Sequence, residues 1–226
     1  MSKKVLIIVS NTKVIGPKHR KTGVFLPEAA HPYGEFDAAG YQVDFASLTG
    51  DVPGLDGMEA KDEPENAKFL NGPGWVKMQN NTKLADVDVS QYDAIFVSGG
   101  LAPMVDLAEN PLIKKVIAET YQRGAIVGAV CHGPVSLLNV KLKDGSYLIK
   151  GKNITAFTNE EEENYAKDDV PFSLETALTN QGAKFHASTA WAPHSIIEGN
   201  LVTGQNPASA KGVAEKMIAI LEAPKK

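Results

Sequence analysis

The residue with the clearest potential for chemistry is Cys131, the only cysteine in a chain of 226 residues. It directly follows the most apolar run of the sequence, residues 125–130, and precedes His132, Gly133 and Pro134. A buried strand that turns sharply into a helix near Pro134 would form a nucleophile elbow, a turn that raises one side chain above the edge of a sheet. The pattern therefore predicts a cysteine nucleophile at a strand-to-helix corner.

The residues around Cys131 favour a reactive thiol over a structural one. Ala129 and Gly133 lie two positions on either side and are small enough to let the backbone pack closely. A helix N-terminus beneath the thiol would favour negative charge and lower the pKa of Cys131. The alternative is that a lone cysteine on an apolar run is a small buried hydrophobe. The polar His132 and the turn that follows it favour the reactive interpretation.

Two further residues are candidates to move protons for this thiol. His132 is adjacent in sequence, but neighbours at such a corner often point apart, so it is either a proton-transfer group or a structural side chain. Glu28 follows the first predicted strand among small and apolar residues, which would desolvate its carboxyl group and raise its pKa. A protonated Glu28 could donate a hydrogen bond to a thiolate. The alternative is an acid that only stabilises a helix N-terminus.

Two other strand ends carry groups of interest. Residues 160–163 are four consecutive glutamates directly after a predicted strand. One of them could orient a histidine, as the third group of a triad does, or the run is simply a solvated loop. Gly99 and Gly100 close another strand, where backbone N–H groups could approach a substrate oxyanion. The sequence predicts no metal site, because metal-ligand spacing is absent from the remaining histidines, His19, His31, His186 and His194.

The elements that would position these residues alternate along the chain. Short apolar runs predict strands at residues 5–9, 41–46, 94–98, 125–130, 153–157, 183–187 and 201–203. Apolar residues at helical spacing predict helices at 111–121 and 207–221. Near-continuous apolar strands are typically covered on both faces. The sequence therefore predicts an α/β fold, a flavodoxin-like, doubly wound, mostly parallel sheet with helices on both faces.

Composition excludes several classes of function. The 23 basic and 27 acidic residues give a net charge of -4, with no basic face for nucleic acid or an anionic membrane. No apolar stretch has transmembrane length, the N-terminal run is too short for a signal peptide, and a single cysteine excludes an internal disulfide. We therefore expect a cytoplasmic protein. Residues 1–226 are expected to form one domain, with the polar segment 49–89 as an irregular insertion that acts as a flap or oligomer contact.

Several segments together resemble a known family. They are residues 21–25 leading to Glu28, then 40–47, 98–100, 129–134 and 201–210. The chain resembles the ThiJ/PfpI (DJ-1) superfamily, which has a class I glutamine amidotransferase-like fold. Within it, the chain is most similar to the branch of heat-shock chaperones with glutathione-independent glyoxalase (glyoxalase III) activity. The Ala-Val-Cys-His-Gly-Pro block at 129–134, combined with the Gly-X-Asn-Pro-X-Ser block at 204–209, is the specific part of the match.

The resemblance implies a role for each matching residue. Cys131 corresponds to the nucleophile, His132 to its histidine partner, and Glu28 to the glutamate that hydrogen-bonds the sulfur. The oxyanion donors would be the backbone N–H groups of Gly100 and His132. The triad acid of this branch follows a Phe-Thr strand end, and Glu162 matches it best, although a one-residue shift among the four glutamates is easy. The family also implies no cofactor and a homodimer.

Two motifs depart from the pattern of the branch. Its Gly-Gly-His-Gly motif is Gly-Gly-Leu-Ala here, so Leu101 replaces a pocket histidine. Its Trp-Asp-Asp motif is replaced by Trp-Ala-Pro-His at residues 191–194. We expect both changes to line the pocket and to alter which substrate is bound.

The resemblance implies an enzyme that acts on a small reactive carbonyl, converting α-oxoaldehydes such as methylglyoxal to lactate. Cys131 would add to the aldehyde, and Glu28 would move a proton between the adjacent carbons. The same residues are compatible with a stress-response holdase chaperone, or with a redox sensor in which Cys131 is oxidised to a sulfinate. A cysteine amidase or peptidase is less consistent, because expelling an amine needs a well-placed general acid.

Overall fold

The computed structural model describes residues 2–224, so residues 1, 225 and 226 of the expected 1–226 domain lie outside the described residues. Within the described range, a central sheet of seven strands runs parallel except for its edge strand β12. In spatial order its strands are β12 (Ser195–Glu198), β13 (Leu201–Gly204), β9 (Ile126–Val130), β8 (Ala94–Val97), β1 (Lys4–Val9), β5 (Gln42–Ser47) and β7 (Thr82–Lys83).

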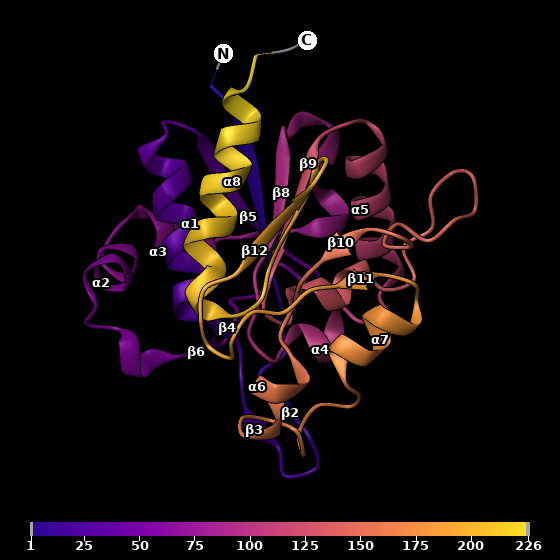
Figure 1. Ribbon diagram of the computed structural model, residues 1–226. Helices are drawn as coiled ribbons and strands as arrows, with labels where there is room; N and C mark the ends of the chain where they lie inside the picture. Colours follow the sequence, from indigo (N-terminus) through magenta and orange to yellow (C-terminus); the bar gives the residue numbers. More distant parts are fainter. Residues whose placement is uncertain (1, 225–226) are drawn as a thin grey trace.

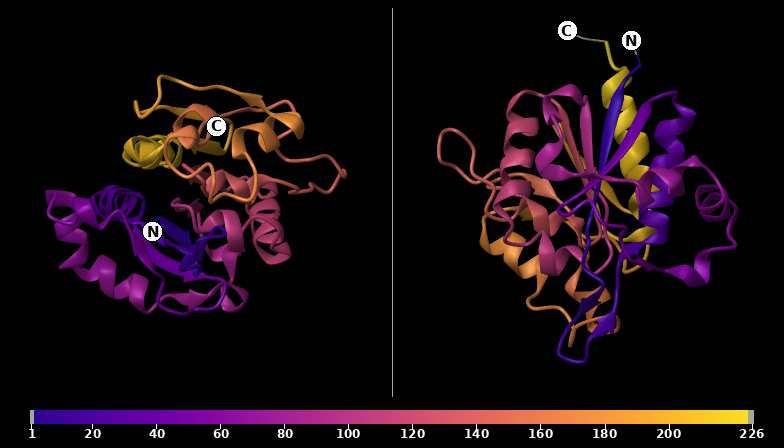
Figure 2. Two further views of the ribbon diagram at one scale, coloured as in Figure 1. Left: turned by 90° about the horizontal axis from the view of Figure 1, so that it is seen from below. Right: turned by 180° about the vertical axis from the view of Figure 1, so that it is seen from behind.

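Helices cover both faces of this sheet. On one face α1 (Leu26–Ala38) and α8 (Ala210–Glu222) lie side by side (Figure 1). On the other face lies α5 (Pro111–Gln122), visible from behind in Figure 2. Residues 5–9 of β1 have no exposed surface, which explains why this strand is apolar at every position rather than at alternate ones. The predicted α/β fold with a mostly parallel sheet is confirmed.

Shorter elements surround the sheet. The remaining α-helices described are α2 (Pro64–Leu70), α3 (Pro73–Gln79), α4 (Pro103–Asp106), α6 (Asn159–Glu163) and α7 (Leu174–Asn180). Small strand pairs are formed by β2 (Val14–Ile15) with β3 (Arg20–Lys21), β4 (Val24–Phe25) with β6 (Leu55–Asp56), and β10 (Asn153–Ile154) with β11 (Lys184–Phe185). None of the helices within residues 2–224 has the length and apolarity needed to cross a membrane.

The structure corrects two strand predictions and adds one strand that was not predicted. The strands predicted at 153–157 and 183–187 shrink to β10 and β11, which pair with each other outside the central sheet. Each of these two strands is only two residues long. His186 and Ala187, which directly follow β11, are exposed. Conversely, β12 was not predicted, because this antiparallel edge strand is only partly buried and Ile197 is 44% exposed. Its residues therefore lack the apolar signal of a central strand.

The prediction of an irregular insertion at 49–89 is wrong in part. The segment contains α2 and α3, followed by β7, which pairs in parallel with β5 and extends the sheet. It is therefore a strand–helix crossover built from very short pieces. Each helix has seven residues, too few for a clear apolar period, yet Phe69 and Met78 are buried against the α1 side of the sheet.

Candidate active site

Cys131 lies at the carboxyl edge of the parallel sheet, the lower end in Figure 1, in a strained turn. It directly follows β9 and has a φ angle of 61°, a left-handed conformation that is uncommon outside glycine. Two backbone hydrogen bonds hold this conformation. The Cys131 N–H donates to the carbonyl of Gly204 at 3.0 Å, and the Cys131 carbonyl accepts from the N–H of Phe157 at 2.9 Å. The predicted sharp turn directly after the strand is confirmed, and the role of Cys131 as a nucleophile stays a prediction.

Glycines allow the strand ends to approach one another closely at this turn. A Cβ atom added to Gly133 would lie 2.6 Å from the carbonyl oxygen of Val97, a collision with rigid backbone. A Cβ atom on Gly99 would lie 2.6 Å from the carbonyl oxygen of Val130 and 2.7 Å from Oε2 of Glu28. Gly133 therefore has the packing role predicted for it, and Gly99 has a similar one at the end of β8.

The segment after the elbow differs from the prediction. The expected helix near Pro134 is a short 3₁₀ helix, η4 (Gly133–Leu137), and the chain turns away at Leu138 and Asn139. All five residues of η4 are buried, so there is no polar face along which an amphipathic α-helix could continue. Asn139 has a φ angle of 59°, which ends regular helical structure.

His132 joins the thiol to an acid. Its Nδ1 atom lies 3.3 Å from Sγ of Cys131, and its Nε2 atom lies 2.6 Å from Oε2 of Glu162. The imidazole is completely buried and lies against the ring of Phe157, with 4.4 Å between ring centroids. Of the two interpretations of His132, this geometry favours proton transfer. The three side chains form the arrangement of a nucleophile, a base and an acid that orients the base.

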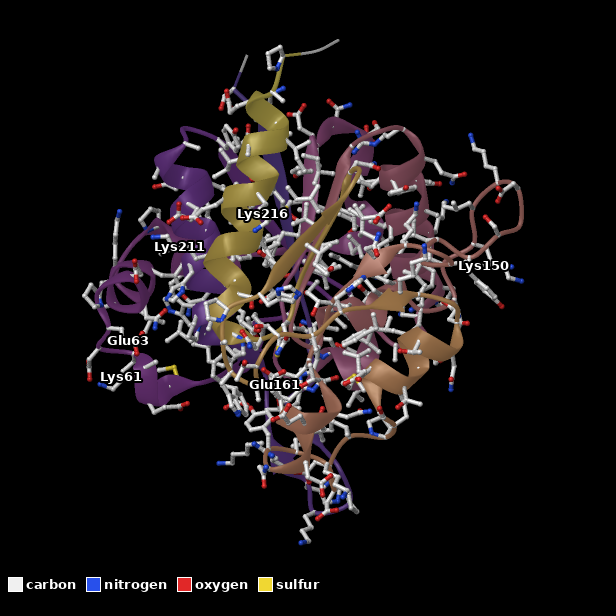
Figure 3. All side chains as sticks on the ribbon, in the orientation of Figure 1. Lys61, Glu63, Lys150, Glu161, Lys211 and Lys216 are labelled. Atoms are coloured by element: carbon white, nitrogen blue, oxygen red, sulfur yellow. The ribbon has the colours of Figure 1, made fainter. Side chains whose placement is uncertain are left out.

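The four consecutive glutamates divide into two kinds. Glu160 and Glu163 are exposed, as a solvated loop would have them, while Glu161 and Glu162 are buried. The Thr158 side chain caps α6 in a capping box with Glu161, which places the next carboxyl group, Glu162, on His132. Figure 3 shows Glu161 in the lower half of the molecule. The structure thus brings Glu162 to the triad position.

Glu28, in the first turn of α1, also lies near Cys131. Its side chain has no exposed surface, and neither carboxyl oxygen has a well-aligned hydrogen-bond partner among residues 2–224. Burial raises the pKa of Glu28 to about 8; the nearby Cys131 thiol and Gly100 N–H oppose the shift, and the charge of Asp56 adds to it. The prediction of a desolvated carboxyl group with a raised pKa is confirmed.

The predicted lowering of the thiol pKa is wrong for this pocket. Burial raises the pKa of Cys131 well above its usual value, and the negative charge of Glu28 and the hydrogen bond that the thiol donates towards this carboxylate raise it further. The backbone N–H groups of Gly100 and His132 lie against the sulfur and act in the opposite direction. These are the two N–H groups predicted as oxyanion donors, and this role stays a prediction.

The two departures from the branch pattern lie in different places. Leu101 has no exposed surface and packs in the apolar core beneath α4 and α5, so the expectation that it lines an open pocket is wrong. His194 faces a cavity beside α8 with Ser195, Lys211 and Lys216. Trp191 is the member of this motif that lies near the site, since its ring contacts Phe157 with 5.4 Å between centroids.

Sequence reasoning missed Tyr165, which follows α6. Its ring centroid lies 5.6 Å from that of Phe157, and its phenol group is close enough to Cys131 and Glu28 for their charges to raise its pKa, although burial is the larger cause. A spacing signal was available, because Tyr165 stands three residues after Glu162 and a helical turn places such residues on one face.

Comparisons with known proteins agree with this geometry. The chain is similar to Glyoxalase 3 of Candida albicans, with 32% identity over 98% of this chain and 99% of that protein. It is 35% identical to the glutathione-independent glyoxalase HSP31 of Saccharomyces cerevisiae, over 97% of this chain and 98% of that protein.

Solved structures give the same result. The crystal structure of glyoxalase III from Candida albicans matches with a TM-score of 0.86 and 32% identity, over 96% of both chains. The Rapid Encystment Protein 24 KDa of Francisella tularensis matches with a TM-score of 0.93 and 34% identity, over 98% of this chain and 100% of that one. The model of the DJ-1/PfpI family matches residues 22–220. The chain therefore belongs to the DJ-1/PfpI family.

Proposed function

We propose that this protein is a glutathione-independent glyoxalase that converts small α-oxoaldehydes, methylglyoxal among them, to 2-hydroxy acids. The observation that carries the proposal is the placement of Cys131 between two buried carboxyl groups, Glu28 beside the sulfur and Glu162 behind His132. The printed names of the relatives from Candida albicans and Saccharomyces cerevisiae support the same activity. The thiol is only 3% exposed, which favours a small substrate.

The first step is addition of sulfur to the aldehyde. The reactive form of the pair holds one proton, with Cys131 as thiolate and Glu28 as carboxylic acid. As the carbon–sulfur bond forms, the carbonyl π electrons move to oxygen, which meets the N–H groups of Gly100 and His132. Glu28 gives its proton to this oxygen and becomes a carboxylate. The product is a hemithioacetal on Cys131.

The second step moves a proton between carbons. The Glu28 carboxylate removes the hydrogen on the former aldehyde carbon as a proton. The electron pair forms a carbon–carbon double bond and the ketone oxygen takes the negative charge, which gives an enediolate. Return of this proton to the adjacent carbon, with the hydroxyl proton passing to the neighbouring oxygen, gives a 2-hydroxyacyl thioester on Cys131. A group with a pKa of about 8 suits both directions of transfer near neutral pH.

Hydrolysis completes the cycle. His132, oriented by Glu162, accepts a proton from a water molecule that attacks the thioester carbonyl, and the sulfur leaves as the thiolate. Transfer of this proton from His132 to the Glu28 carboxylate restores the starting form of the site. Methylglyoxal plus water thus becomes lactic acid with no change in the overall oxidation state. The chemistry needs only the thiol, the two carboxyl groups and the imidazole.

The proposal predicts a rising pH profile. At low pH both Glu28 and Cys131 are protonated, and a neutral thiol adds poorly to a carbonyl. Glu28 loses its proton with a pKa of about 8, and one proton then remains on the pair, resting mainly on Cys131 because burial raises the thiol pKa. Transfer of this proton from the sulfur to Glu28 produces the reactive form. We expect kcat/KM for methylglyoxal to rise from pH 6 to about 8, and a profile that falls over this range would contradict the mechanism.

The direct test is formation of lactate from methylglyoxal by the purified protein without glutathione. We expect turnover by the native chain and none above background by Cys131→Ala. The matched control is Ser136→Ala, which alters another buried residue near the elbow whose hydroxyl bonds only to the Gly133 carbonyl among the described residues. An active Cys131→Ala variant would exclude cysteine-dependent catalysis.

A further inference from the structure

An aromatic cluster leads from the catalytic histidine to the protein surface. Phe157 lies against His132 and is almost completely buried. Its ring centroid is 5.6 Å from that of Tyr165 and 5.4 Å from that of Trp191, and these two are 6.0 Å apart. Trp191 is 49% exposed. The three rings therefore form a continuous wall from the buried imidazole outward, in which Trp191 meets both Phe157 and Tyr165 edge to face, a geometry typical of stable aromatic packing.

Tyr165 holds the middle of this wall in a fixed position. The Arg20 guanidinium lies over its ring at 4.7 Å from the centroid. Arg20 is itself held by Asp169 at 3.1 Å and by the carbonyl oxygen of Tyr165 at 2.9 Å. A cation that stacks on a ring and is held by two hydrogen bonds from Nη1 limits the movement of that ring. Phe157 separates this ring from the imidazole of His132, with 5.6 Å between the centroids of Tyr165 and Phe157 and 4.4 Å between those of Phe157 and His132.

Trp191 is held by the backbone in an unfavourable conformation. Its φ angle is 66°, in the left-handed region that bulky residues avoid. The backbone N–H of Trp191 donates to Oε1 of Glu161 at 2.8 Å. Asn206 Nδ2 donates to this same oxygen and to the carbonyl oxygen of Ala192, each at 2.8 Å. Burial does not account for the strain, since the indole is half exposed. Such strain in a fixed loop beside an active site points to a functional position.

We propose that Tyr165 and Trp191 contact the substituent on the ketone carbon of the α-oxoaldehyde and so determine which substrates are accepted, with Glu161 as the positioning residue for Trp191. This inference rests on the proposed glyoxalase function. The other groups around the sulfur, Glu28 and His132, are completely buried and are used by the aldehyde end of the substrate. The aromatic wall reaches solvent, so a larger substituent extends along it.

The test compares two substrates that differ only in this substituent, methylglyoxal and phenylglyoxal. Loss of a ring stacked on a substrate phenyl group costs about a factor of ten in binding. We expect Trp191→Ala to raise KM for phenylglyoxal about tenfold and KM for methylglyoxal about twofold, with kcat changed less than KM. Tyr165→Leu should act in the same direction. Equal effects of Trp191→Ala on the two substrates would overturn the inference.

The chain offers a matched control in its second tryptophan, Trp75, which lies in α3. Trp75→Phe should leave the ratio of the two kcat/KM values unchanged. Absence of turnover of both substrates by the native chain would instead reject the proposed function. The two failures are therefore distinguishable.

A binding measurement tests the same inference without turnover. In the variant combining Trp75→Phe with Cys131→Ala, Trp191 is the remaining tryptophan. We expect phenylglyoxal to change its fluorescence in a saturable manner. Adding Glu161→Gln should loosen the Trp191 loop and so raise the phenylglyoxal concentration at which half of the fluorescence change is reached. A circular dichroism spectrum would verify that the variant is folded. An unchanged fluorescence signal in the folded Cys131→Ala protein would contradict contact between the ligand and Trp191.

Discussion

Glu28 and Glu161 are both completely buried, but their surroundings are opposite. Glu161 accepts five hydrogen bonds from described residues, two from Thr158 and one each from the Trp191 N–H, Gln205 and Asn206. Neither oxygen of Glu28 has a well-aligned partner among residues 2–224, and its pKa is raised to about 8.

The difference separates a carboxyl group that holds the fold from one that performs chemistry. A buried carboxylate with many donors is stabilised in its charged form and fixed in place. A buried carboxyl group without such donors keeps its proton to higher pH, at a cost in stability when it ionises. Glu161 thus ties three distant segments together, while Glu28 remains free to exchange a proton with Cys131.

The largest expected effect comes from Glu28→Gln. The amide keeps the size of the side chain but cannot transfer a proton, so we expect kcat/KM for methylglyoxal to fall by about a thousandfold. The folded protein should be at least as stable as the native chain at pH 8, because a neutral group replaces one that is partly ionised. Steady-state kinetics and urea unfolding measure the two quantities. Near-native activity would remove Glu28 from the mechanism.

Glu161→Ala is expected to act on stability instead. It leaves the donors of Gln205, Asn206 and the Trp191 N–H without their acceptor, which should lower the free energy of unfolding by about 3 kcal/mol. Glu160→Ala, at the exposed neighbour, is the matched control and should change it by less than about 0.5 kcal/mol. Similar unfolding midpoints for the two variants would contradict the contrast drawn between Glu161 and Glu28.

The pH dependence of stability isolates Glu28. Its pKa is raised in the folded state, so between its usual value of 4.5 and about 8 the folded chain binds more protons than the unfolded chain. Stability from this group is therefore complete below pH 4.5 and decreases as the pH rises towards 8. The difference in unfolding free energy between the native chain and Glu28→Gln should change by up to about 1.4 kcal/mol for each pH unit in this window. A constant difference would contradict the raised pKa.

The smallest effect is expected for the acid behind the imidazole. Glu162→Gln keeps a hydrogen bond to His132 but removes the negative charge, so we expect kcat to fall about tenfold to a hundredfold. Glu163→Gln alters the next residue, which is exposed and pairs with Lys167, and should have no measurable effect on kcat. Equal rates for these adjacent variants would show that His132 does not depend on Glu162.

The central strands could be predicted, because the residues of each strand alone carry the signal. The apolar runs at β1, β8 and β9 indicate strands because both faces of each strand are covered, so every position carries the signal. The edge strands β12 and β7 lack it, since one is partly exposed and the other has two polar residues. Their pairing depends on neighbours elsewhere in the sheet, which no local pattern records.

The site shows the same division. The elbow at Cys131 follows from its own neighbours, whereas the choice between Glu161 and Glu162 depends on donors more than forty residues away, Gln205 and Asn206. The pKa of Cys131 could not be predicted from a helix N-terminus, because burial and the carboxyl group of Glu28 have the larger effect. The spacing of residues did not pair Glu28 with Cys131 or Glu162 with His132, and the resemblance to a known family supplied both pairings.

Two backbone hydrogen bonds, to Gly204 and Phe157, hold Cys131 at the edge of the sheet. The rate at which its thiol is labelled therefore measures how often this edge opens. A bulky disulfide reagent cannot reach a sulfur that is 3% exposed until this edge of the sheet separates. Since the chain has one cysteine, every labelled molecule reports a single event at a single place. Labelling rates measured across denaturant concentrations would show whether the elbow opens alone or only when the whole sheet unfolds.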